Sequence, residues 1–241
     1  MEMMEELKKI IEEALMPAQG CTDPVSVAFA AARARQELSK RIGEVGELEK
    51  IKVTVNANLY KNAARVTIPG TTDCGVTMAA ALGYLAGDSD RNLEVLSELA
   101  EDDIEAAKEL VEKDLFEIEI NRDINRLLID LELTTSGNIA GETGEDIIGA
   151  AGETGSEKLR LVILDYYTSV EAVEYGAEIG NFKIEPVNPE SRKKQLVEKY
   201  DLEDFIKFAK EVEVDQLKIL KEGIKLSKKL ADEGMEKSAG M

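Results

Sequence analysis

The period of the hydrophobic pattern changes several times along this chain of 241 residues, and these changes decide its fold class. Apolar residues three or four apart, such as Leu7, Ile10 and Ile11, predict amphipathic helices. Alternation of apolar with polar residues, as at Ile51 and Val53, predicts half-buried strands. The order helix, strands, helices, strands, helices favours an α+β fold, with helices around small, mostly antiparallel sheets in two lobes.

The same patterns give the expected positions of the elements. Helices are predicted near residues 4–16, 23–40, 72–85, 90–99, 102–113, 190–199, 202–212 and 213–232. Strands are predicted as a pair at 50–57 and 65–68, a hairpin at 115–134, two strands at 158–165 and 168–174, and a short one near 178–184. Three regions follow: an α+β lobe at 1–113, a β-rich lobe at 114–187 with a Gly-rich insertion at 135–157, and C-terminal helices at 188–241.

The Gly-rich insertion contains the tetrapeptide GETG twice, at 141–144 and 152–155. Glycine-rich turns are able to cradle phosphates, but here no lysine follows the repeat, and its glutamates would repel an anion. A flexible loop is the better interpretation. The segment PVNP at 186–189 reads as a linker between the second region and the C-terminal helices.

The balance of charges limits the partners. The chain has 30 Lys and Arg against 49 Asp and Glu, which gives a formal net charge of −19. So negative a chain repels nucleic acid and anionic lipid, and we expect neither as a partner. No apolar run approaches the ~20 residues that cross a bilayer, and the acidic, amphipathic N-terminus is unlike a signal peptide. The chain is therefore expected to be cytoplasmic, with a homo-oligomer as an open alternative to a monomer.

The absence of histidine excludes several chemistries within this chain. It rules out a Ser-His-Asp triad, a histidine-containing zinc site and a papain-like pair. The two cysteines, Cys21 and Cys74, are too few to hold a cubane cluster, which normally takes three or four protein thiolates. We therefore predict no metal site in this chain, and its chemistry is left to thiols, carboxylates and lysines.

The segment around Cys21 is the first candidate for chemistry. Thr22-Asp23-Pro24 predicts a helix start, with Asp23 as the N-cap and Pro24 at the first helical position. The helix that follows is rich in alanine, so a neighbouring backbone is able to approach it closely. Amides at a helix start stabilise negative charge, which suits a thiol for work as a nucleophile or general base. The alternative is that Cys21 is a small core residue, as free cysteines often are.

A second candidate lies downstream. Asn58, Lys61 and Asn62 are predicted to lie on a hairpin, which leads to Gly70 and Thr71 at the start of the next helix. The amides of that helix start, with Lys61 as counter-charge, would suit the carboxylate of an amino acid. The alternative is an ordinary hairpin followed by an ordinary capped helix. Cys74 is predicted in the first turn of that helix, as a second reactive thiol or, more simply, as a packing residue.

Together the two segments resemble the archaeal and bacterial L-cysteine desulfidase family, which is similar to the serine dehydratase α-subunit group. The first matching stretch is PAQGCTDP at 17–24, followed by VSVAFAAARA. The second comprises Asn58–Asn62, Ile68–Thr71 and Ala79–Gly83. Two ordered motifs at compatible spacing are more specific than either alone. The similarity is strong to about residue 88, and it is faint at 167–170 and 176–179.

The resemblance implies a lyase without pyridoxal phosphate. Such an enzyme converts L-cysteine to pyruvate, ammonia and sulfide, or L-serine to pyruvate and ammonia. It uses a [4Fe-4S] cluster whose open iron site binds the leaving group. The matching cysteine, Cys21, is implied to remove the Cα proton. The implied substrate-binding residues are Asn58, Lys61, Asn62, Gly70 and Thr71.

Two departures from the family pattern qualify this function. The cluster cysteines of the family lie in a C-terminal region that this chain lacks, and Tyr167 stands where the family has histidine. The chain is then truncated, half of a split enzyme, or a degenerate relative. One hypothesis is a lyase half-site completed by a cluster-bearing partner chain or C-terminal region. The alternatives are a non-catalytic amino-acid-binding or assembly subunit, and a purely structural subunit.

Overall fold

A computed structural model describes residues 2–137, 155–184 and 199–236, and it confirms the α+β class. The chain divides into two compact units, residues 18–184 and residues 1–17 with 185–241. The predicted linker at 186–189 and most of the predicted insertion and of the helix near 190–199 lie outside the described residues. None of the described helices combines the length and apolar character needed to cross a membrane.

The unit of residues 18–184 contains the sheet and the helices packed on it. Its helices are α2 (Thr22–Ile42), α3 (Ala57–Ala63), α4 (Val76–Ala86) and α5 (Glu101–Val111), with 3₁₀ helices at Ser89–Glu94 and Gly176–Glu178. Its strands are β1 (Leu48–Asn56), β2 (Phe116–Asn121), β3 (Leu128–Thr135), β4 (Glu157–Leu164) and β5 (Val170–Tyr175). The expected strand at 178–184 is wrong, because the chain makes a 3₁₀ turn there and then has no regular structure.

The five strands form one mixed sheet in the order β2-β1-β3-β4-β5. β1 pairs in parallel with β2 and antiparallel with β3, so that Val53 lies between Ile118 and Leu131. The hairpin predicted at 115–134 is therefore wrong, since β1 separates its two strands. The boundary predicted at residue 113 also differs from the structure, because the sheet joins β1 to strands beyond that residue.

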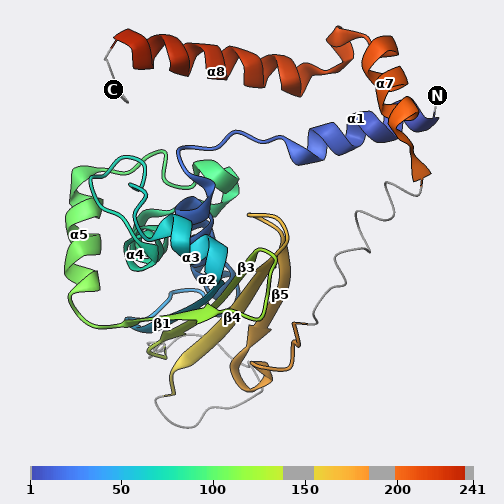
Figure 1. Cartoon of the computed structure of the whole chain (residues 1–241). Helices are drawn as coiled ribbons and strands as arrows, with labels where there is room; N and C mark the ends of the chain where they lie inside the picture. The colour runs from blue at the N-terminus through green and yellow to red at the C-terminus, as the bar shows by residue number, and fades with distance from the viewer. Residues whose placement is uncertain (1, 138–154, 185–198, 237–241) are drawn as a thin grey trace. The chain divides into compact units, whose positions relative to one another are not determined.

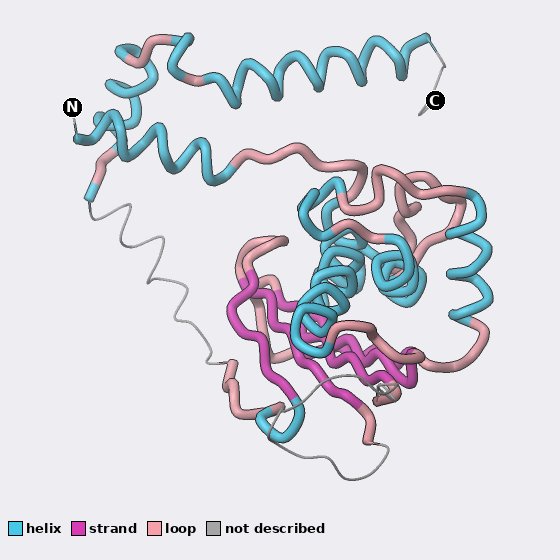
Figure 2. Tube along the Cα trace, turned by 180° about the vertical axis from the view of Figure 1, so that it is seen from behind, coloured by secondary structure: helices cyan, strands magenta, loops and turns pink. Residues whose placement is uncertain are grey.

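One face of the sheet is covered by α2, α3 and α4 (Figure 1), and Figure 2 shows the same arrangement from behind. Alternate residues of the strands, including Ile51, Val53 and Leu131, form the core with α2 and α4. The expected close approach to the alanine-rich helix is confirmed. A Cβ on Gly83 of α4 would lie 2.1 Å from the main-chain oxygen of Ala28, so α2 and α4 pack with their backbones nearly in contact.

The opposite face of the sheet carries charged side chains. Arg160 donates from Nε and Nη2 to the two carboxylate oxygens of Asp130, both at 2.7 Å, and from Nη1 to Glu174 at 3.0 Å. These three side chains are only about one tenth exposed. Fork-shaped pairing of this kind fixes the register of β3, β4 and β5 more firmly than exposed pairs do.

The other unit is built from α1 (Glu2–Ala14), α7 (Leu202–Glu211), a 3₁₀ turn (Val214–Gln216) and α8 (Lys218–Glu236). Its small core comprises Leu7, Tyr200 and Phe208. Glu6 of α1 accepts hydrogen bonds from Lys199 and Tyr200. The helices predicted at 4–16 and 202–212 are confirmed, and the one predicted from 213 begins at Lys218 after the 3₁₀ turn.

Candidate functional site

Cys21 lies at the N-terminus of α2, as the sequence predicted, but as the cap itself. Its φ of −74° and ψ of 127° are extended, and the helix begins at Thr22. The prediction that Asp23 is the N-cap is wrong, because Asp23 is already the second helical residue and is buried. The Cys21 thiol makes no capping hydrogen bond and is half-buried. Cys21 is therefore not packed into the apolar core.

The second motif lies on a helix instead of a hairpin. Residues 57–63 form α3 directly after β1, so the prediction of a strand pair at 50–57 and 65–68 is wrong in its second half. Asn58, Lys61 and Asn62 all lie exposed on this helix. Among the described residues, Lys61 has no hydrogen-bond or ion-pair partner, which leaves its ammonium available to an anion.

One hydrogen bond joins the two motifs. The side-chain amide of Asn62 donates to Oδ2 of the buried Asp23 at 2.8 Å. The main-chain oxygen of Asp23 accepts from the Ser26 hydroxyl at 2.8 Å. A buried carboxylate needs a donor such as the Asn62 amide, because an unpaired one costs several kcal/mol. Residues 39 positions apart are thereby held together at the start of α2.

A close contact joins the motifs at a second point. Gly20 has a φ of +75°, and a Cβ there would lie 2.5 Å from Cγ of Pro69. Only glycine meets both conditions, since other residues rarely adopt that φ and their side chains would collide with the proline ring. The residue before Cys21 therefore packs directly against the turn that contains Gly70 and Thr71.

The turn after Pro69 is held by its own hydrogen bonds. Gly70 is exposed and has a φ of +82°, and the Thr71 hydroxyl bonds to the main chain of Ile68 and Asp73 at 3.0 to 3.3 Å. The helix start predicted at 72–73 is wrong, because α4 begins at Val76 with Gly75 as its N-cap. Gly70 and Thr71 thus lie in a hydrogen-bonded turn that precedes the helix start.

Cys74 is also placed differently from the prediction. It precedes α4 instead of lying in its first turn, and residue 74 forms an isolated antiparallel bridge with Thr67. It is exposed, so the prediction of a packing role is wrong. No group of three or more potential metal-ligating side chains occurs among the described residues. With two thiols in the whole chain, these residues do not fit a [4Fe-4S] cluster.

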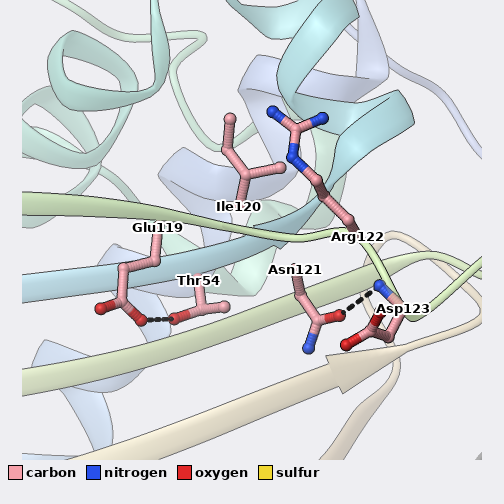
Figure 3. A pocket seen from close by; sticks show the side chains of 6 residues that line it. All are labelled: Thr54, Glu119, Ile120, Asn121, Arg122 and Asp123. Atoms are coloured by element: carbon pink, nitrogen blue, oxygen red, sulfur yellow. Dashed lines mark hydrogen bonds between the residues drawn. The ribbon is translucent and has the colours of Figure 1, made fainter.

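A shallow depression lies elsewhere on the molecule, at the ends of the parallel strands β1 and β2 (Figure 3). Glu119, Thr54 and Asn121 project from one side of the sheet, and Arg122 projects from the other. The Thr54 hydroxyl donates to Glu119 at 3.3 Å. The depression contains none of the residues that the sequence predicted, and its mixed charges define no recognisable ligand.

The contact between Asn62 and Asp23 gives a direct stability prediction. Asn62→Ala leaves the buried Asp23 carboxylate without this donor, so we expect a loss of about 1–3 kcal/mol in the free energy of unfolding. Asn58→Ala on the same short helix is the matched control and should change stability by less than about 0.5 kcal/mol. Urea denaturation of the three proteins measures both effects. Equal stability of the two variants would show that the Asn62 contact is unimportant.

Comparison with known proteins gives relatives along the whole length of the chain. A UPF0597 protein of Clostridium perfringens is 31% identical over 99% of this chain and 50% of its own length. A UPF0597 protein of Chromobacterium violaceum is 32% identical over 98% of this chain and 49% of its own length. One from Clostridium tetani is 27% identical over 98% of this chain and 50% of its own length. No family model and no solved structure matches. The chain is thus similar to UPF0597 proteins and spans about half the length of these relatives.

Proposed function

We propose that this chain supplies the catalytic-base half of a lyase that eliminates sulfide from L-cysteine or water from L-serine. The observation that carries the proposal is the convergence of the two sequence motifs on the start of α2. Asn62 donates a hydrogen bond to Asp23, and Gly20 packs on Pro69. The half-buried Cys21 lies between Gly20 and Asp23 in the sequence. Two motifs that resemble one lyase family in sequence are therefore also neighbours in space.

The proposed roles follow from the chemistry of each side chain. The Cys21 sulfur removes the Cα proton of the substrate, and the electron pair left on Cα forms a double bond to Cβ as the bond from Cβ to sulfur or oxygen breaks. The resulting enamine takes up water and releases pyruvate and ammonia. Lys61 is exposed without a partner among the described residues and supplies a positive charge for the substrate carboxylate.

The leaving group needs assistance that the described residues do not supply. The described residues do not fit an iron–sulfur cluster, and the chain spans about half of its relatives. We therefore propose that the cluster is bound by further sequence or by a separate chain. Anaerobic reconstitution with iron and sulfide tests this. We expect no pyruvate from this chain alone and pyruvate formation when the cluster-bearing part is added.

A second candidate function is a non-catalytic amino-acid-binding or assembly subunit. The absence of cluster ligands from the described residues favours it, since binding needs only the surface around Lys61 and Gly70. Isothermal titration calorimetry with L-cysteine and L-serine distinguishes the two. Binding without turnover after iron and the cluster-bearing part are supplied would support this second function. A chain that binds neither amino acid in any assembly would be a structural subunit.

A further inference from the structure

Apart from Ser227 at its middle, one side of helix α8 is entirely apolar, and no residue of the helix is buried. Its charged residues occupy the other half of the helix circumference. The described residues of its own unit leave the large side chains of the apolar side uncovered: Ile224 is 66%, Leu230 58% and Met235 79% exposed. Folded proteins normally bury a continuous apolar helix face, so this face of α8 is suited to bind another protein segment.

Small and large side chains occupy separate parts of this face. Gly223, Ser227 and Ala231, spaced four residues apart, form a stripe of small residues along its middle. Larger side chains flank the stripe and extend to both ends of the helix: Ile219, Leu220, Ile224, Leu226, Leu230 and Met235. A Cβ on Gly223 or Gly234 would meet nothing within 4 Å. Glycine within a helix costs about 1 kcal/mol relative to alanine, and close approach of a second helix offsets that cost.

The order of sizes is nearly the same when the helix is read in either direction from Ser227. In an antiparallel pair crossing at Ser227, Gly223 faces Ala231 of the other copy, and Ile224 faces Leu230. Leu220 then lies over Gly234, so a large side chain meets a small one. A face that fits an unrelated segment has no reason to be symmetric about its own middle.

The charges of α8 favour the same orientation. The first turn and a half, 218–222, carries two lysines and one glutamate, and the matching part at the other end, 232–236, carries three acids. An antiparallel copy centred on Ser227 places these two ends beside each other, with Lys218 near Glu236 and Lys221 near Glu233, whereas a parallel copy places the three acids of one helix beside those of the other. Although the whole chain has a charge of −19, α8 itself has five basic and four acidic residues, so its own charge does not oppose pairing.

We propose that the apolar side of α8 binds α8 of a second copy of this chain, antiparallel and centred on Ser227. Light scattering after gel filtration in 0.15 M salt should give twice the 26.4 kDa mass of the chain. Ser227→Lys places a charge in the middle of the interface and should give a monomer with unchanged helix content by circular dichroism. Asp232→Asn, on the charged side, changes the charge by the same amount and should leave the dimer intact.

Three results would overturn this proposal. They are a monomeric wild-type chain, a dimer that survives Ser227→Lys, and a monomer whose α8 becomes covered only when the sequence present in the longer relatives is added. The last two would place the interface elsewhere or give the face a different occupant. Each is independent of the proposed activity, because none involves an amino acid or a cluster.

Cysteine cross-linking tests the orientation. Disulfides need Cα atoms within about 7 Å, which the small central residues permit. Ser227→Cys should cross-link to itself, and a mixture of Gly223→Cys with Ala231→Cys should cross-link one variant to the other. The wild-type chain, with Cys21 and Cys74, is the control. Self-linking of Gly223→Cys without linking in the mixture would indicate a parallel pair and contradict the proposed arrangement.

Discussion

Cys21→Ala is expected to lower the rate of pyruvate formation by the assembled enzyme by about 10²–10⁴-fold, the usual contribution of a general base. The fall should be in kcat, with a smaller change in KM, because the thiol acts on the proton at Cα and does not hold the substrate carboxylate. Initial rates of pyruvate and sulfide release, measured anaerobically over a range of substrate concentrations, give both constants.

The matched control for Cys21 is the other thiol of the chain. Cys74 is exposed and closely follows the turn that contains Gly70 and Thr71, but it does not lie at the start of α2. Cys74→Ala should therefore retain nearly full activity. If Cys21→Ala retains activity, or if both variants lose it equally, the base assignment is wrong and a general effect of thiol loss explains the result.

Arg160→Met should lower the free energy of unfolding by about 3–5 kcal/mol, because it leaves Asp130 and Glu174 largely buried without their shared partner. For a unit of this size, that is a fall in Tm of roughly 10 °C. Lys50→Met is the control, since Lys50 pairs with Glu117 on the same face but both are about half exposed. It should cost at most about 1 kcal/mol. A similar loss in both variants would contradict the special position of Arg160.

The cluster around Arg160 also predicts a pH dependence. Burial raises the pKa of Glu174, but the amides of Gly180 and Phe182 and the guanidinium of Arg160 outweigh burial and lower it. A carboxyl group with a lowered pKa stabilises the fold above its ordinary pKa, and this contribution is lost as the pH falls through the folded value. The gap in stability between wild type and Arg160→Met should therefore narrow in urea denaturation below about pH 4.5. A gap that stays constant would contradict this.

The local sequence pattern predicted the individual strands better than it predicted which strands pair in the sheet. The alternation in residues 50–57 gave β1, and the alternating residues after 115 gave β2 and β3. Their pairing was wrong, because the choice between a hairpin and insertion of β1 depends on contacts 60 or more residues apart, such as that of Val53 with Ile118. The sequence predicts a hairpin around Asn58, Lys61 and Asn62, whereas residues 57–63 form a helix that packs on α2.

In the candidate site, too, local features were predictable and tertiary contacts were not. The position of Cys21 at a helix start followed from the proline and glycine near it, since these residues have strong local preferences. Nothing in the local sequence indicated that Asn62 would donate to Asp23, or that Gly20 would lie against Pro69. The positive φ of Gly20 fits the usual role of glycine, but the identity of its neighbour is decided by the tertiary fold.

The proposed function requires an amino acid to bind beside the Cys21 sulfur, and thiol alkylation tests this on the chain itself. Mass spectrometry would follow the modification of Cys21 and Cys74 by iodoacetamide, with L-serine or D-serine present, since neither carries a thiol. We expect L-serine to slow the modification of Cys21 in proportion to occupancy and leave the exposed Cys74 unchanged. Equal modification of Cys21 with L-serine, with D-serine and with neither amino acid, at up to tens of millimolar, would contradict this proposal.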